Sequence, residues 1–273
     1  RPNEGVFSFQ DDERWLSLRY DLTAPLARFA AENFESLPKP YRRWAAGPVW
    51  RNEKPGPGRF REFWQCDADT VGSASPAADA EMIAMACAAL EAVGLKRGEY
   101  QLKVSSRRLL DAVLDKVGAT ETGTRLTVLR AIDKFDRLGA QGVLLLLGPG
   151  RKDESGDFTK GAGLSLSDSN EVLGFIRGAS RETREGTLTR LTRLLGADSP
   201  GVVELREVDA ALTAMGVGED QAAFDTSIVR GLEYYTGAVF EAQFINASGV
   251  SFGSIGGGGR YDGLAASFRG EPV

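Results

Sequence analysis

Histidine is absent from this chain of 273 residues, and cysteine occurs only at Cys66 and Cys87. The absence of histidine excludes Ser/His/Asp triads, histidine general bases and histidine-liganded zinc. Two cysteines far apart in the sequence cannot form a disulfide framework or a cysteine-rich metal site, so a reducing cytoplasm is the expected location. The longest apolar run, 143–147, is far shorter than the ~20 residues that a membrane span needs, and no membrane association is expected.

The charge of the chain is unevenly distributed. The 33 Lys and Arg against 38 Asp and Glu give a net charge of −5, which argues against a protein that coats nucleic acid without specificity. Between Lys39 and Arg61, however, seven residues are basic and only Glu53 is acidic. This segment indicates a local anionic ligand such as a nucleotide, with a solvated charged face as the alternative.

The hydrophobic pattern predicts an α+β fold. Alternating apolar residues predict a short hairpin at 6–18 and a long one from 44–51 and 61–71, around a Pro/Gly-rich tip. Thr23 can cap a following helix. Further helices are expected at 76–94, 107–117, 125–138, 169–176, 184–195 and 208–215, and further strands at 100–104, 223–229 and 234–244. We expect an antiparallel core of residues 1–104 and 202–273, interrupted by a mostly helical insertion at 105–201.

The familiar phosphate-binding loops are missing from the sequence. No GxGxxG follows a predicted strand, and no GxxxxGK[ST] occurs. The glycine run Gly256–Gly259 indicates a backbone that something approaches closely, either a ligand or a neighbouring strand.

The long predicted hairpin carries residues that together can bind ATP. Arg51 and Glu53 lie two apart on one strand and therefore face the same side. Arg51 can hold a phosphate oxygen, and Glu53 can accept a hydrogen bond from an exocyclic amine. Phe63, on the returning strand, offers a ring on which a base can stack, and Arg59 and Arg61 can close over the polyphosphate.

Four ordered stretches carry a family resemblance. They are LRYDLTAPLARFAAENF (18–34), GPVWRNEKPGPGRFREFWQCDADTVG (47–72), IVRGLEYYTGAVFEA (228–242) and GGGGRYDGL (256–264). The second resembles motif 2 of the class II aminoacyl-tRNA synthetases, and the third the histidine-specific signature of the histidyl-tRNA synthetases. The resemblance implies a class II antiparallel sheet flanked by helices, in a homodimer.

The resemblance also implies a role for each matching residue. Arg51 and Arg230 would be catalytic arginines at the ATP α-phosphate. Glu53, Arg59 and Phe63 would complete the ATP site. Asp21, Thr23 and Gln65 would bind the α-amino group of histidine. Asp69, Tyr235 and Tyr261 would bind its imidazole. A carboxylate and a phenol can satisfy both nitrogens of a neutral imidazole.

The activity implied is that of a histidine–tRNA ligase. Histidine and ATP would form histidyl-adenylate with help from Mg²⁺, and the histidyl group would pass to the 3′-terminal adenosine of tRNA(His). Electrostatic stabilisation by arginines needs no protein nucleophile, and no metal ligand is assigned among the residues.

Each of these residues also has a plain structural interpretation. Asp21 and Thr23 could cap a helix, and Asp69 could be an exposed strand residue. Tyr235 and its neighbour Tyr234 point to opposite faces of a strand, so one of the two is expected to pack. Arg230 could be an ordinary turn residue.

The sequence departs from the family in its missing parts. Motif 1, motif 3 and the anticodon-binding domain are not found, so impaired catalysis is expected of the chain as written. One alternative function is a non-catalytic relative that serves as regulatory subunit of ATP phosphoribosyltransferase in histidine biosynthesis. A second is a stress-sensing domain that binds uncharged tRNA. The presence of Arg51, Glu53, Arg59 and Arg230 disfavours both.

Overall fold

The computed structural model describes residues 5–56, 58–152, 156–177, 182–228, 235–245 and 253–270. The chain folds into two compact units. The first consists of Arg1–Ala78 and Asp262–Val273, and the second of Asp79–Tyr261.

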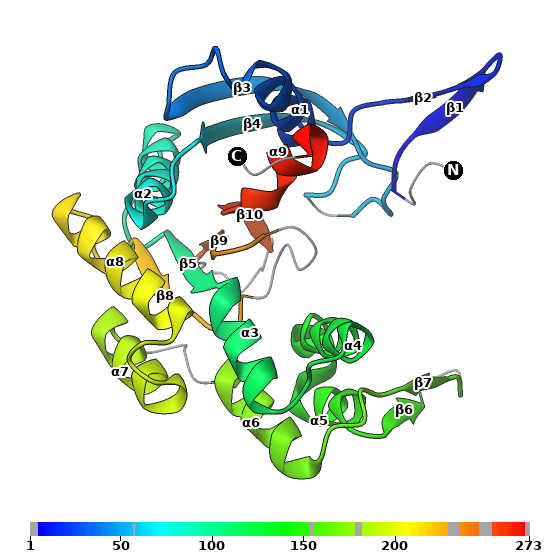
Figure 1. The fold of residues 1–273 in the computed structure, drawn as a ribbon, viewed down its shortest axis with the longest axis vertical. Coiled ribbons are helices and arrows are strands. Elements are labelled where there is room, and N and C mark those ends of the chain that lie inside the picture. Colours follow the sequence, from blue (N-terminus) through cyan, green and yellow to red (C-terminus); the bar gives the residue numbers. More distant parts are fainter. Residues whose placement is uncertain are drawn as a thin grey trace. The chain divides into compact units, whose positions relative to one another are not determined.

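The first unit is built from two hairpins and two helices (Figure 1). Its elements are β1 (Ser8–Asp11), β2 (Arg14–Ser17), α1 (Thr23–Asn33), β3 (Tyr41–Trp50), β4 (Glu62–Val71) and α9 (Asp262–Arg269). Both hairpins predicted from the sequence are confirmed, and both are antiparallel. α9 contacts α1, and Arg269 Nη2 donates to Glu35 Oε1 at 2.6 Å just beyond the end of α1.

The long hairpin, β3 with β4, has two different faces. Its register runs from Tyr41 opposite Val71 to Trp50 opposite Glu62. The odd-numbered residues of both strands are buried or half-buried, while most even-numbered ones are exposed. Period-two alternation of this kind produces a strand with one covered side. Phe63, Gln65 and Asp69 of the predicted site therefore share the covered side.

The second unit contains a four-stranded sheet and most of the helices. Its elements are α2 (Pro76–Ala92, which begins in the first unit), β5 (Tyr100–Ser106), α3 (Arg107–Lys116), α4 (Thr122–Ile132), α5 (Phe135–Leu147), β6 (Gly150–Lys152), β7 (Phe158–Lys160), α6 (Leu166–Arg177), α7 (Arg184–Leu195), α8 (Pro200–Ala214), β8 (Ala222–Phe224), β9 (Ala238–Phe244) and β10 (Ser254–Gly259). The strand order is β10-β9-β5-β8. β9 is antiparallel to both neighbours, and β5 pairs with β8 in parallel.

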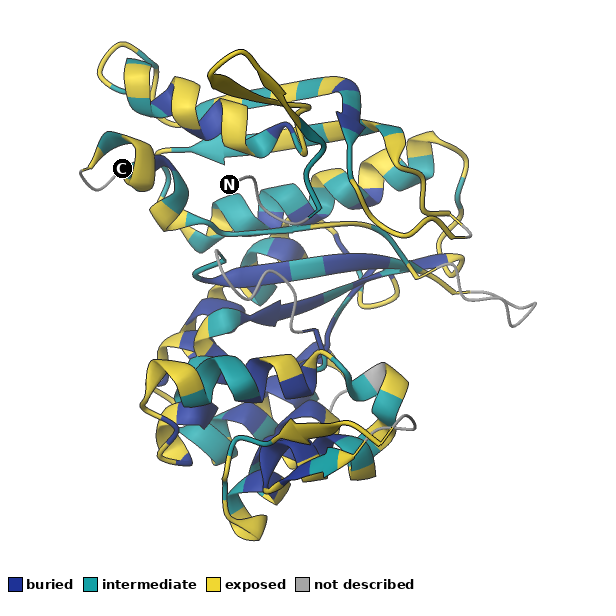
Figure 2. Ribbon diagram, turned by 90° about the vertical axis from the view of Figure 1, so that its right-hand side faces the viewer, coloured by how far each residue is buried: buried dark blue, intermediate teal, exposed yellow. Residues whose placement is uncertain are grey.

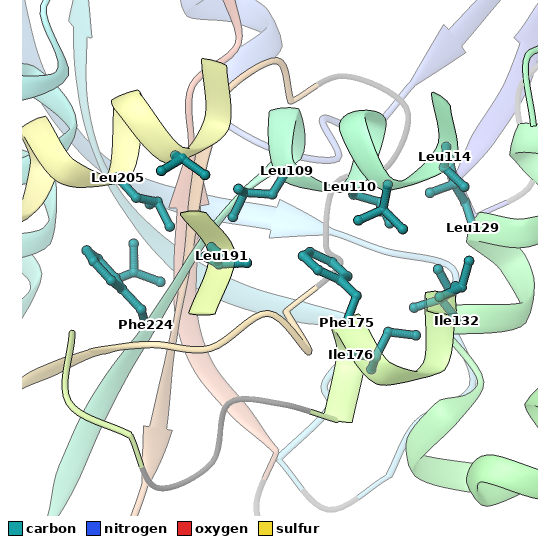
Figure 3. Close-up of a cluster of buried hydrophobic side chains, with 14 of the residues drawn as sticks. Leu109, Leu110, Leu114, Leu129, Ile132, Phe175, Ile176, Leu191, Leu205 and Phe224 are labelled. Carbon is teal, nitrogen blue, oxygen red and sulfur yellow. The ribbon is translucent and has the colours of Figure 1, made fainter. Parts of the chain in front are cut away.

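The core of the second unit is formed by this sheet and by helices α2 to α8. Figure 3 shows Leu109 and Leu114 of α3 in one continuous apolar cluster with Phe175 of α6, Leu205 of α8 and Phe224 of β8. α3 begins where it does because the Ser106 Oγ accepts a hydrogen bond from the Arg108 N–H at 3.2 Å. The strands β5 and β9 are mostly buried, whereas the β1–β2 hairpin of the first unit is mostly exposed (Figure 2).

Several predicted elements have different bounds in the structure. The helix expected at 125–138 is two helices, α4 and α5, separated at Asp133 and Lys134. The predicted strands at 223–229 and 234–244 are shorter, as β8 and β9. The small hairpin of β6 and β7 lies between α5 and α6, where no strand was predicted. The α+β class is as expected from the sequence.

Candidate functional site

Arg51 and Phe63, two of the predicted ATP-binding residues, lie together at the end of the long hairpin. Arg51 directly follows β3, and its N–H donates to the carbonyl oxygen of Arg61 at 2.9 Å. The guanidinium carbon lies 5.0 Å from the centre of the Phe63 ring and 4.7 Å from that of Tyr20. Arg51 Nε also donates to the Tyr20 carbonyl oxygen at 3.3 Å. The cation is thus held between two aromatic rings, from which a phosphate can draw it.

Glu53 is attached to the same cluster through Tyr20. The Tyr20 hydroxyl donates to Glu53 Oε1 at 3.1 Å. Burial and this hydrogen bond to a carboxylate raise the pKa of Tyr20, so the phenol remains a donor. Tyr20 was not among the site residues predicted from the sequence. The feature that could have indicated it is its position in the stretch 18–34, directly before Asp21.

The basic loop between the strands is a tight turn. Gly56 and Arg59 exchange backbone hydrogen bonds of 3.2 and 2.9 Å, and the Arg59 side chain is exposed. The side chain of Arg61 instead donates to Asn52 Oδ1 and lies 4.6 Å from the centre of the Phe7 ring. Of these two cations, Arg59 is therefore the one placed to reach a solvent-exposed phosphate chain.

Two of the predicted histidine-binding residues are joined by a residue that the sequence did not reveal. Thr23 Oγ1 donates to Asp67 Oδ2 at 3.2 Å, and Gln65 Nε2 donates to Asp67 Oδ1 at 2.7 Å. Asp69 lies on the same face of β4, opposite Arg43. These half-buried groups belong to one hairpin and to the start of α1.

The capping interpretation holds for Asp21 and is wrong for Thr23. Asp21 Oδ1 accepts the Ala24 N–H at 2.9 Å, as a capping carboxylate does. The N-cap position of α1 is Leu22, and no side chain caps it from that position. The Thr23 hydroxyl turns to the long hairpin instead.

The segment 19–23 is fixed across β3 by backbone contacts. The Trp50 N–H donates to the Arg19 carbonyl oxygen at 3.0 Å, and Arg19 Nε donates to the Pro48 carbonyl oxygen at 2.8 Å. A Cβ at the buried Gly47 would lie 3.6 Å from Arg19 Nη2 and 3.9 Å from Leu22 Cδ2. This approach places Tyr20, Asp21 and Thr23 beside the residues of the long hairpin.

The two predicted imidazole-selecting tyrosines belong to the second unit. The Tyr235 ring lies against Gly259, where a Cβ would be 2.9 Å from Tyr235 Cδ1. The glycine run also allows β10 to pack closely against β9, because a Cβ at Gly257 would lie 2.7 Å from the carbonyl oxygen of Phe240. Any larger residue at either glycine would displace its neighbour. Tyr261 directly follows β10 and Arg260.

Backbone hydrogen bonds and one buried ion pair hold the backbone next to both tyrosines. The Thr236 N–H donates to the Arg260 carbonyl oxygen, and the Arg260 N–H to Ala238, both at 2.8 Å. The Arg260 side chain pairs with Asp79 at 2.8 and 3.1 Å, with little of either side chain exposed.

Glu204 supports the same backbone from α8. It accepts a hydrogen bond from the Ser106 hydroxyl, lies 3.7 Å from Arg108 Nε, and would meet a Cβ at Gly237 at 2.6 Å. Burial raises the pKa of the Glu204 carboxyl.

Arg230 falls in 229–234, outside the described residues, so its catalytic role stays a prediction. Over the described ranges, no group of three or more Cys, Asp or Glu side chains could hold a metal ion. Among the helices that the structure describes, none is long and apolar enough to cross a membrane.

The comparisons with known proteins point to one family. The sequence profile of the histidyl-tRNA synthetases matches residues 3–272. The chain is similar to the histidine–tRNA ligases of Caulobacter vibrioides, at 60% identity over 99% of the chain and 57% of the relative, and of Methylocella silvestris, at 58% over 100% and 57%. Among solved structures it resembles the histidyl-tRNA synthetase of Nostoc, with a TM-score of 0.78 and 27% identity over 98% of the chain and 58% of that protein.

The chain spans about 57% of the length of these curated relatives. Its profile match and its identity to them nevertheless extend over nearly every residue, and its structural neighbours share the predicted α+β, class II fold. The chain belongs to the histidyl-tRNA synthetase family.

Proposed function

We propose that the protein activates L-histidine with ATP to histidyl-adenylate and transfers the histidyl group to the 3′-terminal adenosine of tRNA(His). The observation that carries the proposal is the cluster of Arg51, Glu53 and Phe63 on the long hairpin. It gathers a phosphate ligand, an amine acceptor and a stacking ring in the absence of a phosphate-binding loop. The names of the curated relatives support the same activity.

In the first step the histidine carboxylate attacks the α-phosphorus of ATP, and pyrophosphate leaves. Negative charge accumulates on the phosphoryl oxygens, where Arg51, drawn from its position over Tyr20 and Phe63, and Arg230 would stabilise it. The adenine would stack on Phe63, with its exocyclic amine donating to Glu53. Arg59, on the exposed turn, would contact the outer phosphates.

The histidine substrate would lie beside the ATP groups. Asp21, Thr23 and Gln65 would receive its α-amino group, since all three offer oxygen acceptors to an ammonium. Asp69, Tyr235 and Tyr261 would select the imidazole by satisfying both ring nitrogens. A site of this kind discriminates against amino acids that leave the groups unpaired. The adenylate is then consumed by the terminal ribose hydroxyl of the tRNA.

The remaining assignments are part of the same proposal. We expect Mg²⁺ to arrive with the ATP phosphates, assign no residue to it and derive no step through it. The functional protein is a homodimer of the cytoplasm, a location that the free thiols of Cys66 and Cys87 favour. Residues 105–201, which hold α3 to α7, form an insertion between core parts 1–104 and 202–273.

Histidine-dependent exchange of pyrophosphate into ATP tests the activation step, with several other amino acids as controls. Among the amino acids tested, we expect only histidine to support exchange. Charging of tRNA(His) then tests transfer. A protein that binds histidine but supports neither reaction would match the regulatory alternative and contradict the proposal. A histidine-selective rise in the unfolding temperature measures binding independently, because a ligand at a hundredfold excess over Kd stabilises the native state by about 2.7 kcal/mol.

A further inference from the structure

We propose that Asp67 is a positioning residue that makes the proposed histidine pocket selective for a substrate ammonium group. This inference rests on the proposed function and adds a residue to its site. Asp67 contacts two of the residues assigned to the α-amino group, and it does so with one carboxylate oxygen for each.

The hydrogen bonds of Asp67 fix the polarity of both partners. An ionised carboxylate only accepts hydrogen bonds, so whatever faces it must donate. At Oδ1 the donor is Gln65 Nε2, at 2.7 Å, and at Oδ2 it is the Thr23 hydroxyl, at 3.2 Å. The Gln65 amide is therefore turned with its oxygen away from Asp67, and the Thr23 oxygen keeps its lone pairs for another donor.

In this arrangement Gln65 Oε1 is an acceptor that does not face Asp67. It is buried and has no hydrogen-bond partner among the described residues. A buried acceptor without a partner costs free energy in the empty protein, and a cationic donor that reaches it recovers more than a neutral one does. An α-ammonium group has three N–H donors, enough for Gln65 Oε1 and Thr23 Oγ1 together.

The surroundings of Asp67 favour the same substrate group. On β3 the residues opposite Gln65 and Asp67 are Gly47 and Ala45, so the residues that face these two polar side chains across the hairpin are small. Asp69 follows on the same face, and Asp21, which precedes α1, accepts a hydrogen bond from the Ala24 N–H in the first turn of that helix. Among the described residues, no Lys or Arg pairs with the Asp67 carboxylate, so its negative charge can complement an ammonium.

The test uses Asp67→Asn, which keeps the shape of the side chain but adds an amide donor. That donor can face Gln65 or Thr23 and reverse the polarity that the carboxylate imposes. Asp12→Asn is the matched control, because Asp12 is exposed in the β1–β2 turn at φ 50°, a conformation that Asn also adopts. Four ligands are compared by calorimetry: ATP, L-histidine, L-histidinol, which keeps the amine, and imidazolepropionate, which lacks it.

We expect Asp67→Asn to weaken the binding of L-histidine and L-histidinol about 10- to 100-fold. The affinities for imidazolepropionate and ATP should change less than about twofold. Asp12→Asn should bind all four as the unsubstituted protein does. If Asp67→Asn weakened imidazolepropionate binding as much as histidine binding, Asp67 would have only a structural role, and the inference would be overturned. Unchanged histidine binding would overturn it as well.

A second variant guards against misfolding of the first. Thr23→Val removes one acceptor and leaves the Asp67–Gln65 pair, and the same amine-specific loss is expected. Absence of histidine binding and exchange in the unsubstituted protein would overturn the proposed function itself. Histidine binding and exchange without amine-specific loss in either variant would overturn only the role of Asp67.

Discussion

The two units use their polar side chains in opposite ways. In the second unit Arg184, Glu204 and Asp225 are almost fully buried, and their partners lie within the fold. In the first unit Arg51, Glu53 and Asp67 are half-buried or exposed and are linked to neighbours by a few contacts. The difference indicates that these three charges of the second unit stabilise structure, while the three named in the first are available to ligands. Substitutions should therefore separate stability from activity.

The largest effect on stability is expected at Arg184 in α7. Its side chain is 6% exposed, pairs with Asp209 at 2.6 Å and donates to the carbonyl oxygens of Val217 and Ala222 at 3.2 and 3.3 Å. Arg184→Met leaves the Asp209 carboxylate and the two carbonyl oxygens without this partner. We expect the free energy of unfolding to fall by about 3–5 kcal/mol. Urea unfolding measures the loss.

Arg193→Met is the control on the same helix, where the side chain is exposed. It should change the free energy of unfolding by less than about 0.5 kcal/mol. A loss below about 1 kcal/mol in Arg184→Met would mean that this buried cation is not a structural element of the second unit.

Arg51→Ala should show the converse pattern. Its guanidinium lies over two rings and makes one side-chain hydrogen bond, so unfolding should change little. Pyrophosphate exchange should fall about 100- to 1000-fold, which corresponds to about 2.7–4 kcal/mol of transition-state stabilisation. Arg28→Ala, an exposed residue of α1 with a surface pair to Glu32, is the control for both measurements. Normal exchange in Arg51→Ala would remove this residue from the mechanism.

The hairpins could be predicted from sequence because their signal is local. Alternation in β3 and β4 and the Pro/Gly-rich tip between them determine where the chain reverses. The break between α4 and α5 was missed because Asp133 and Lys134 are neither Gly nor Pro. The left-handed Gly139, at φ 62°, comes only later inside α5. Apolar periodicity continues across such a break and conceals it.

The site was predicted from motifs, and motifs contain only part of it. Tyr20 and Asp67 were missed because Tyr20 pairs with Glu53, 33 residues away, and Asp67 joins its neighbour Gln65 to Thr23, 44 residues away along the chain. A tyrosine or aspartate on a strand has no local signal for such a contact. The contact depends on how Arg19 crosses β3, which tertiary packing decides.

A pH-dependent stability is expected from Asp225 in the second unit. Burial alone would raise the pKa of its carboxyl, but hydrogen bonds from Ser227 and Lys103 bring that pKa below the ordinary value of 3.8. A depressed pKa means that the folded state binds fewer protons, so the stabilisation is present above about pH 3.8 and is lost as the pH falls through the folded pKa.

Asp225→Asn should therefore lower the free energy of unfolding by about 1.5–3 kcal/mol at pH 7, as expected for lost hydrogen bonds to a charged group. The gap to the unsubstituted protein should narrow as the pH falls below about 3.8. Urea unfolding from pH 7 to pH 3 measures it, with exposed Asp198→Asn as control. A gap independent of pH would show that the charge of Asp225 does not stabilise the fold.

The smallest effect is expected at Tyr20, where the first unit holds a ligand-binding group by one hydrogen bond. The phenol donates to Glu53 Oε1 at 3.1 Å and so orients the carboxylate whose other oxygen would meet the adenine amine. Tyr20→Phe keeps the ring under Arg51 and removes this bond, which is worth about 0.5–1.5 kcal/mol. The KM for ATP should rise about 2- to 12-fold, with the KM for histidine and the unfolding temperature nearly unchanged. Tyr41→Phe, on the long hairpin beside Phe29, is the control. A lower KM for ATP would mean that Tyr20 competes with adenine for Glu53, and the first unit would then hold its polar groups closed until ATP arrives.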